Sequence, residues 1–283
     1  MHAFICTACG TQYPPSETAP AMCIICQDER QYVPPGGQTW TTLEALATGR
    51  YNAFRQHEPG VIGIGTQPPF AIGQRALILC TEHGNVLWDC ISLLDTATVT
   101  LINGLGGLKA IGISHPHFYT TMVEWSRAFG GIPVYTHADD ARWIMRPDPA
   151  IVRWQGEALD LLPGVRLVRC GGHFPGGAVL NWRHGAGGRG VLFSSDIATV
   201  TVDRKFLSFM RSYPNLIPLS QKQVYAIGAA LAALECDTIY GHFFDRAISR
   251  GGKDILARSI GRYANAISGA YTASAACEGS GAA

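Results

Sequence analysis

The sequence predicts a layered α/β domain that is preceded by a small four-cysteine module. From about residue 60 onward, short β-type runs alternate with loops and with segments of helical periodicity. This alternation is typical of sheets covered by helices. Before that region, two Cys-x-x-Cys motifs stand close together near the start of the chain. Such a cluster in so short a segment indicates a separate unit with its own means of stabilisation.

Composition and charge narrow the class of protein. The chain has 283 residues, of which 47% are hydrophobic and 15% charged, so a sizeable core is possible. The net charge is +1 and the basic residues are scattered, so we expect no nucleic-acid partner. We find no apolar run of the roughly 18–20 residues that would span a bilayer. The start, MHAFICTACG, lacks a secretory pattern, so we expect a cytoplasmic protein without a membrane partner.

The N-terminal segment contains four candidate metal ligands, which are Cys6, Cys9, Cys23 and Cys26. Each Cys-x-x-Cys turn can direct two thiolates at one ion, and two turns complete a tetrahedral shell. Gly10 supplies the tight backbone that such a turn needs. A bound ion would provide most of the folding free energy of so short a segment. We therefore predict a structural Zn²⁺ site of zinc-ribbon or rubredoxin-like type, and an electron-passing iron site is the alternative.

The domain boundaries follow from composition. Residues 33–41, VPPGGQTWT, read as a linker because two prolines and two glycines stand together. We predict a zinc-ribbon module over residues 1–37 and a large domain over residues 38–275. The remaining residues, 276–283, lack a packing pattern and are predicted to form a flexible tail.

The large domain contains several β-type runs. Residues 76–80 and 86–89 flank EHGN, which is a hairpin signal. Further strands are predicted at residues 110–114, 133–136, 165–170, 178–182 and 191–194.

Helical periodicity marks three segments of the large domain. Thr121 and Glu124 have the spacing of a capping box in front of MVEWSRAF. Ser220 and Gln223 have the same spacing in front of a helix whose apolar residues recur at three and four. A third helix is predicted near residues 256–267.

Histidine and aspartate side chains stand where predicted strands end. These residues are Asp89, His115, His117, His173, Asp196 and His242. Strand ends in a layered α/β domain converge on one rim, where ligand sites tend to lie. Imidazole and carboxylate are suitable ligands for Zn²⁺ or Fe²⁺. We therefore predict a second metal site at this rim.

The order and spacing of these residues resemble the metallo-β-lactamase fold superfamily over roughly residues 60–245. That family has an aspartate after an early strand, then H-x-H-x-D-H, a lone histidine, a lone aspartate and a final histidine. The resemblance implies a four-layered αββα sandwich with the metal at one edge of the two sheets. It also implies that His115, His117 and His173 form a first metal site and that Asp89 orients a loop. By the same resemblance, Asp196 bridges the first site to a second.

The sequence departs from the family pattern at the second metal site. Tyr119 and Thr120 stand where the family has the aspartate and the last histidine of H-x-H-x-D-H. Only His242 and Asp196 remain of the second ligand set. We therefore predict one metal ion, not two, in the histidine-rich site.

This ligand set favours a metal-dependent hydrolase of a small-molecule ester, thioester, lactone or amide. Three imidazoles leave a position for a metal-bound water, which Zn²⁺ activates near neutral pH. Asp196 is a candidate base, Tyr119 a candidate donor to an oxyanion, and His242 a candidate donor to a leaving group or substrate carboxylate.

Two alternatives remain open at this point. One is a non-haem iron oxidoreductase in which the cysteine module acts as a rubredoxin-like relay. The other is a catalytically degenerate metal-binding protein, which the missing second-site ligands motivate. The sequence determines neither the substrate nor the oligomeric state.

Overall fold

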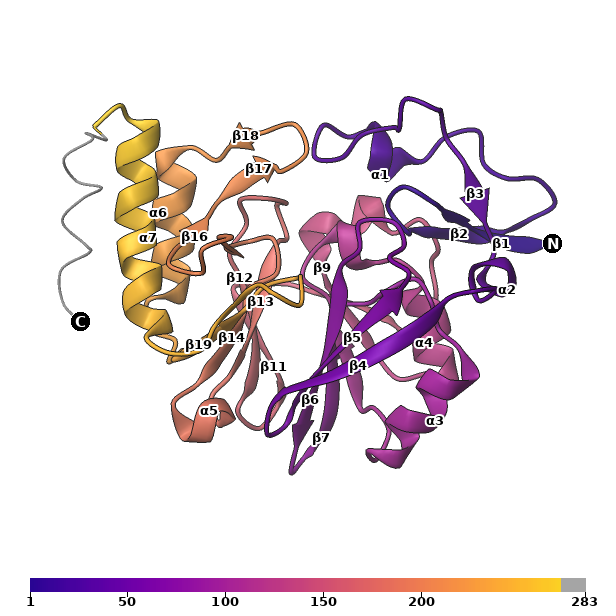
Figure 1. The fold of residues 1–283 in the computed structure, drawn as a ribbon, viewed down its shortest axis with the longest axis horizontal. Helices are drawn as coiled ribbons and strands as arrows, with labels where there is room; N and C mark the ends of the chain where they lie inside the picture. Colours follow the sequence, from indigo (N-terminus) through magenta and orange to yellow (C-terminus); the bar gives the residue numbers. More distant parts are fainter. Residues whose placement is uncertain (271–283) are drawn as a thin grey trace.

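Two β-sheets pack face to face, and helices cover the outer face of each sheet (Figure 1). The structure is a computed structural model that describes residues 1–270. This arrangement of layers confirms the four-layered αββα sandwich predicted above. The predicted tail, residues 276–283, lies outside the described residues.

The first sheet has seven strands in the order β10-β9-β8-β7-β6-β5-β4. The strands from β4 to β7 are antiparallel neighbours, and those from β7 to β10 are parallel neighbours. Their bounds are β4 (Tyr51–Glu58), β5 (Val61–Gln67), β6 (Arg75–Thr81), β7 (Gly84–Trp88), β8 (Ala110–Gly112), β9 (Val134–His137) and β10 (Ile151–Trp154). β6 and β7 form the hairpin that the sequence predicts, whereas β4 and β5 fall outside the predicted strands.

The second sheet has six strands in the order β11-β12-β13-β14-β19-β20. All neighbours are antiparallel except β14 and β19, which are parallel. Their bounds are β11 (Ala158–Leu162), β12 (Val165–Arg169), β13 (Ala178–Trp182), β14 (Val191–Phe193), β19 (Thr238–Tyr240) and β20 (Ala247–Ile248). β12 and β14 both run antiparallel to β13, so they point the same way and their carboxyl ends lie at the same edge.

The alternation of side chains along the strands separates the layers. Leu77 of β6 is buried in one cluster with Leu180 and Phe193 of the second sheet, so this cluster is the core between the sheets. Its neighbour Ile78 belongs to a different cluster, together with helical residues such as Trp125. Successive strand residues point to opposite faces, and both faces of each sheet are therefore buried.

Helices close the two outer layers. The first sheet is covered by α3 (Thr96–Gly104) and α4 (Met122–Ala128), and the second by α6 (Gln221–Leu231) and α7 (Gly252–Ile267) (Figure 1). Val224, Ile227 and Leu256 of the second pair pack in one cluster with residues of the second sheet. Short elements connect the layers: η1 (Pro116–Phe118), η2 (Ala138–Trp143) and α5 (Gly185–Gly188). Within residues 1–270, no helix combines the length and apolarity that a bilayer span requires.

The two predicted capping boxes have different outcomes. The Ser220 hydroxyl accepts a hydrogen bond from the backbone N–H of Gln223, and Gln223 Oε1 accepts one from the backbone N–H of Ser220, so this capping box is confirmed. The box at Thr121 is wrong, because the Thr121 hydroxyl donates to the carbonyl oxygens of Ile91 and Ser92 instead. Thr121 has φ −104° and ψ 35°, which is not the extended backbone that directs a capping side chain at the helix.

The four-cysteine module packs against the large domain instead of standing apart (Figure 1). It contains β1 (His2–Cys6), β2 (Gln12–Ser16) and α1 (Ile24–Gln27). β1 also pairs with β3 (Trp40–Thr41), and α2 (Leu43–Leu46) follows. Its buried residues, including Ile25, share one cluster with Trp125 and Phe174 of the large domain. The module and the first sheet thus have a continuous core, and the boundary after residue 37 stays a prediction.

Two small hairpins lie between β14 and α6. They are formed by β15 (Thr199–Val200) with β16 (Leu207–Ser208), and by β17 (Met210–Ser212) with β18 (Ile217–Pro218). Both hairpins stand beside the edge of the sandwich where the histidines gather.

Candidate metal centres

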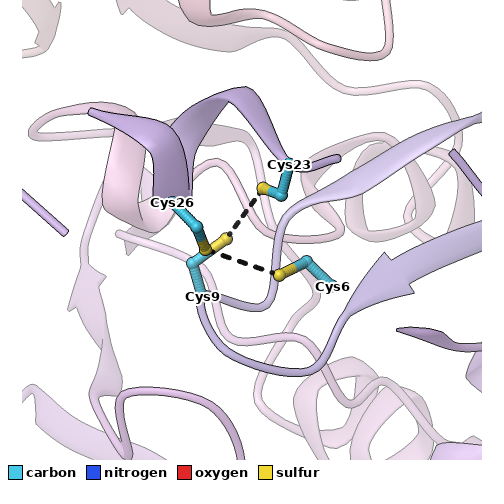
Figure 2. A group of neighbouring side chains, drawn as sticks. All are labelled: Cys6, Cys9, Cys23 and Cys26. Carbon is cyan, nitrogen blue, oxygen red and sulfur yellow. Dashed lines mark hydrogen bonds between the residues drawn. The ribbon is translucent and has the colours of Figure 1, made fainter. Parts of the chain in front are cut away.

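The four N-terminal cysteines converge on one point (Figure 2). All four are buried, and their sulfur atoms lie within 4.8 Å of one another. Cys6 Sγ is 3.6 Å from Cys26 Sγ, and Cys9 Sγ is 3.6 Å from Cys23 Sγ. A tetrahedral ion about 2.3 Å from each sulfur needs separations of about 3.8 Å between sulfurs, so the cluster has the dimensions of a four-thiolate metal site.

The backbone around the cysteines is shaped for this convergence. Gly10 has φ +82°, and its N–H donates to the carbonyl oxygen of Cys6 at 2.8 Å. A Cβ at Gly10 would lie 2.3 Å from Ser92 Oγ, so only glycine allows this close approach to the large domain. Gln38 Nε2 donates to Cys6 Sγ at 3.1 Å, which favours a thiolate at that position.

The second candidate centre lies at one edge of the sandwich. Each of its residues follows the carboxyl end of a strand, as predicted: Asp89 follows β7, His115 and His117 follow β8, His173 follows β12, Asp196 follows β14 and His242 follows β19. The nitrogen and oxygen ligand atoms of His115, His117, His173 and Asp196 lie within 4.8 Å of one another, and all four residues are buried.

Asp196 stands at the centre of this cluster. Its Oδ2 is 3.2 Å from His115 Nε2, 3.9 Å from His117 Nδ1 and 4.0 Å from His173 Nε2. Its Oδ1 is 2.8 Å from His242 Nδ1. The structure therefore brings all five residues together, with His242 reaching the cluster through the carboxylate.

Neighbouring groups fix which nitrogen of two histidines faces the centre. Ser114 Oγ donates to Ser195 Oγ at 3.0 Å, so it accepts the proton of His115 Nδ1 at 2.9 Å. The carbonyl oxygen of Met210 can only accept, so His173 Nδ1 donates to it at 3.0 Å. The Nε2 atoms of both rings then carry lone pairs toward the cluster, which is the tautomer that a metal ligand needs.

Burial favours the neutral form of two imidazoles in the cluster, while the carboxylate of Asp196 stays ionised. Burial lowers the pKa of His115 to about 4 and holds the pKa of His173 well below its usual value. Burial alone would raise the pKa of Asp196, but the nearby imidazoles, His242 foremost, outweigh it and hold this pKa well below the usual range. Three imidazoles and one carboxylate form a suitable donor set for a divalent cation.

Unpaired buried atoms test whether an ion would fit. His115 Nε2 and Asp196 Oδ1 are buried and make no contact of hydrogen-bond geometry among residues 1–270, although Asp196 Oδ1 lies 2.8 Å from His242 Nδ1. Buried polar atoms without partners are costly, and an ion bound by His115 and Asp196 would satisfy them. The donor set and its unpaired atoms thus fit a bound cation.

Asp89 acts on the cluster indirectly. Its backbone has φ +62°, and its Oδ1 accepts a hydrogen bond from the backbone of Ser114 at 2.8 Å. Burial raises the pKa of Asp89 to about 7, against the hydrogen bonds that favour its ionised form. It thereby orients the loop that carries Ser114 and His115.

Tyr119 lies away from the cavity beside the cluster. Its buried hydroxyl is 3.5 Å from the carbonyl oxygen of Asp140, and its ring belongs to the core under α4. Thr120 beside it is buried with φ +33°.

Two residues that the sequence did not single out touch the candidate centre. Arg30 of the cysteine module donates through Nε to the carbonyl oxygen of His173 at 2.6 Å. The Tyr213 hydroxyl, from the β17–β18 hairpin, donates to the carbonyl oxygen of Asp196 at 3.0 Å. Neither stands in a recognisable motif, because each reaches the site only through the tertiary fold.

A cavity of about 480 Å³ opens onto the cluster. His117, His173, Asp196 and His242 form part of its wall. Arg30 and Gln31 of the cysteine module also line it, so the module borders the candidate active site.

Comparisons with known proteins identify a relative over almost the whole chain. No protein-family model matches the sequence. Over 269 residues the chain is 45% identical to the uncharacterized protein YmaE of Bacillus subtilis (strain 168), and the match spans 94% of this chain and 97% of that protein.

Solved structures share the fold of the large domain. VMB-1 at pH 5.5 superposes with a TM-score of 0.56 and 12% identity over 78% of this chain and 98% of its own. The DIM-1 metallo-β-lactamase exposed to ceftazidime superposes with a TM-score of 0.55 and 13% identity over 76% of this chain and 97% of its own. TTHA1623 in a di-iron-bound form gives a TM-score of 0.51 and 20% identity over 70% of this chain and 97% of its own. These likenesses concern the fold alone.

Proposed function

Because the chain belongs to the same family as YmaE of Bacillus subtilis and has the metallo-β-lactamase fold, we propose that it is a metal-dependent hydrolase of a small-molecule ester, thioester, lactone or amide. The observation that carries the proposal is the buried cluster of three histidines and one aspartate at the wall of a cavity. The fold alone does not choose a substrate, so the proposal rests on the site.

His115, His117 and His173 would hold the cation, with Asp196 as a fourth ligand or as a neighbour of the fourth position. A bound Zn²⁺ or Fe²⁺ would act as a Lewis acid, and Zn²⁺ would lower the pKa of a bound water to about 7. The hydrogen bonds of His115 with Ser114 and of His173 with Met210 orient the rings for this task.

Asp196 and His242 would handle protons. The Asp196 carboxylate stays ionised and is placed to orient a water or to accept its proton. His242 Nδ1 lies 2.8 Å from Asp196 Oδ1, and His242 lines the cavity. His242 would deliver a proton to the leaving group, and Asp196 would hold the His242 ring in place. Tyr119 has no part in this scheme, because its hydroxyl is directed at Asp140.

We propose one ion in this centre. Among residues 1–270, histidine, cysteine and acidic side chains come close enough to share an ion at only two places, the four-cysteine cluster and this one. Tyr119 and Thr120 supply no imidazole or carboxylate beside His242, so a second ion would lack ligands.

We propose that the four-cysteine module binds a structural Zn²⁺. A shell of four thiolates is closed and leaves no position for a substrate. Its contribution to the reaction would be indirect, through Arg30 and Gln31 at the border of the cavity.

A larger cavity, away from the candidate centre, is lined by none of the candidate metal ligands. It has a volume of about 820 Å³ and is bordered by Asp160, Arg166, Arg183 and Glu235. Neither cluster of candidate metal ligands borders it. We therefore place the substrate in the smaller cavity.

The experiment compares hydrolysis of nitrophenyl esters, thioesters and lactones by zinc-loaded wild type, His117→Ala and Asp196→Asn. The proposal expects turnover by the wild type and a loss of at least about a hundredfold in both variants. Turnover that both variants retain would refute the proposed site. Oxygen consumption by an iron-loaded protein that hydrolyses none of the substrates would favour the oxidoreductase, and absence of both activities would favour a degenerate metal-binding protein.

A further inference from the structure

The cavity beside the candidate centre is polar at one end and apolar over most of its wall. The histidine cluster contributes His117, His173, Asp196 and His242 to the wall of this cavity. The apolar wall is built by Ile72, Val200, Val202, Met210, Leu216 and Phe243. A hydrolase cavity of this kind separates the reacting group from an apolar part of its substrate.

Two of the apolar residues are unusually exposed. Val202, in the turn after β15, and Leu216, between β17 and β18, are each 78% exposed. Leu216 also has φ +55°, a left-handed backbone that a leucine adopts at a cost. Exposed apolar side chains and a left-handed leucine do not stabilise the folded chain. A bound apolar group that covers Val202 and Leu216 would account for both features.

The charges around the cavity exclude one class of substrate. Asp196 is the acidic residue of its wall and belongs to the candidate metal cluster, while Arg30 and Arg246 are its cations. A substrate with a cationic tail would meet no carboxylate along the apolar wall. The wall fits a neutral hydrocarbon chain.

We propose that the substrate is an acyl ester or thioester with a hydrocarbon acyl chain of medium length, which lies between the two hairpins and covers Val202 and Leu216. The carbonyl carbon lies at the histidine cluster, and the chain extends along Val200 and Met210. Water adds to the carbonyl carbon, and the bond from that carbon to the ester oxygen or thioester sulfur breaks. One proton of the water goes to the leaving group, and the other goes to the solvent. The products are a fatty carboxylate and the free alcohol or thiol. This inference rests on the proposed function.

The test measures kcat/KM of the zinc-loaded protein for nitrophenyl acetate, butanoate, hexanoate and octanoate. A fully buried methylene contributes about fourfold to kcat/KM, and a half-open wall contributes about twofold to fourfold. We therefore expect a rise of at least about tenfold from butanoate to octanoate. Val202→Asn/Leu216→Asn should flatten this rise, so that kcat/KM for octanoate falls toward the value for butanoate. Asparagine tolerates the left-handed backbone at position 216, and both sites are exposed, so the double variant should fold.

The matched control is Leu101→Asn, which changes a leucine of α3 that is 54% exposed and does not line the cavity. It should keep the full dependence on chain length. Binding of acetate and octanoate to the zinc-loaded protein, measured by calorimetry, provides a readout that needs no turnover. Octanoate should bind at least about tenfold more tightly than acetate in the wild type, and the double variant should remove the difference.

The outcomes separate this inference from the hydrolase proposal. Hydrolysis without dependence on chain length, and equal binding of the two carboxylates, would overturn the inference and leave the hydrolase intact. Tight octanoate binding without hydrolysis of any ester would overturn the hydrolase and support the apolar chain site. If the double variant kept the chain-length dependence and altered only the sedimentation of the protein, the two hairpins would be a contact between copies and the inference would fail.

Discussion

Arg30 in the four-cysteine module and His173 in the candidate metal centre are joined by a hydrogen bond of 2.6 Å from Arg30 Nε to the carbonyl oxygen of His173. The guanidinium of Arg30 also lies 4.5 Å from the ring centroid of Phe174. The ring of His173 is held from the other side by the carbonyl oxygen of Met210. Asn215, in the same hairpin as Met210, donates to the carbonyl oxygens of Glu29 and Gln31. The cysteine module therefore supports the loop of one candidate ligand through two separate paths.

Arg30→Met tests this support. The variant keeps much of the aliphatic packing but loses the hydrogen bond to His173 and the contact with Phe174. Loss of a residue that orients a ligand typically lowers metal affinity about tenfold to a hundredfold. We expect zinc affinity of the histidine centre to fall by about tenfold, measured by competition with a chromophoric chelator, while zinc in the cysteine module is retained.

The control for Arg30→Met is Arg127→Met. Arg127 is an exposed arginine that pairs with Asp148 at 2.8 Å and lies outside the cavity wall. Its substitution should leave both zinc sites unchanged. An affinity at the histidine centre that is equal in Arg30→Met and wild type would show that the module does not support His173.

Gly10→Ala tests how closely the cysteine module must approach the large domain. Alanine at this position combines the cost of φ +82° with a Cβ 2.3 Å from Ser92 Oγ. Gly37→Ala is the matched control, because Gly37 has φ +89° but no atom near the added Cβ. The control should lose about 1 kcal/mol of unfolding free energy and Gly10→Ala clearly more, about 2–4 kcal/mol, as measured by urea denaturation. Equal losses would mean that Ser92 moves aside freely.

Ser220→Ala tests the confirmed capping box of α6. The serine hydroxyl accepts from the backbone of Gln223, and its removal leaves a helix N–H without that partner. We expect a loss of about 1 kcal/mol in unfolding free energy and unchanged metal content. Ser268→Ala is the control, because Ser268 is exposed and stands at the C-terminal end of α7. This variant should lose less than about 0.5 kcal/mol of unfolding free energy. A smaller loss in Ser220→Ala than in Ser268→Ala would contradict the capping role.

His57→Gln tests a pH dependence that arises away from the metal centres. Burial, and then the charge of Arg75, lower the pKa of His57 to about 4 from an ordinary value of 6.5. Between these values the unfolded chain binds a proton that the folded chain does not, so this group reduces stability as pH falls from about 6.5 toward 4. Above this window the group contributes no pH dependence.

Glutamine keeps a side-chain partner for Arg75 Nη1, which lies 2.8 Å from His57 Nε2, and removes the titration. The ring is only half buried, so solvent screening reduces its contribution to on the order of 1 kcal/mol. Between about pH 7 and about pH 5, the unfolding free energy of the wild type should fall by about 1 kcal/mol more than that of His57→Gln. Parallel curves for the two proteins would contradict the lowered pKa.

Much of the candidate site was predictable because its residues occur at strand ends in a fixed order. Asp89, His115 and Asp196 each follow an apolar run whose strand character the sequence indicates, and the fold brings those strand ends to one edge. The role of Arg30 was not predictable in this way. Its sequence neighbours read as an ordinary charged surface, and only the docking of the cysteine module places it at His173.

The fold elements that were missed lack a clear local signal. α3 is rich in threonine and includes Val99, and both residue types have modest helix propensity. Asp95 stands just before the helix, and its carboxylate caps the helix by accepting from the backbone N–H of Thr98. β4 lies at the edge of the first sheet and mixes exposed with half-buried side chains, so it shows no alternation of apolar and polar residues. The formation of both α3 and β4 therefore depends on tertiary packing more than on local sequence.

The measurement that tests the central claim most directly is the metal content of protein purified without added metal. It compares the wild type with His115→Ala/His117→Ala, with Cys6→Ser/Cys9→Ser, and with the control His2→Ala/His83→Ala, whose histidines are exposed. The account predicts two ions per chain in the wild type and control, and loss of one ion in the His115/His117 variant while the cysteine site stays loaded. Equal metal content in the wild type and the His115/His117 variant would show that the buried histidine cluster holds no ion, and the proposed hydrolase would lose its catalytic centre.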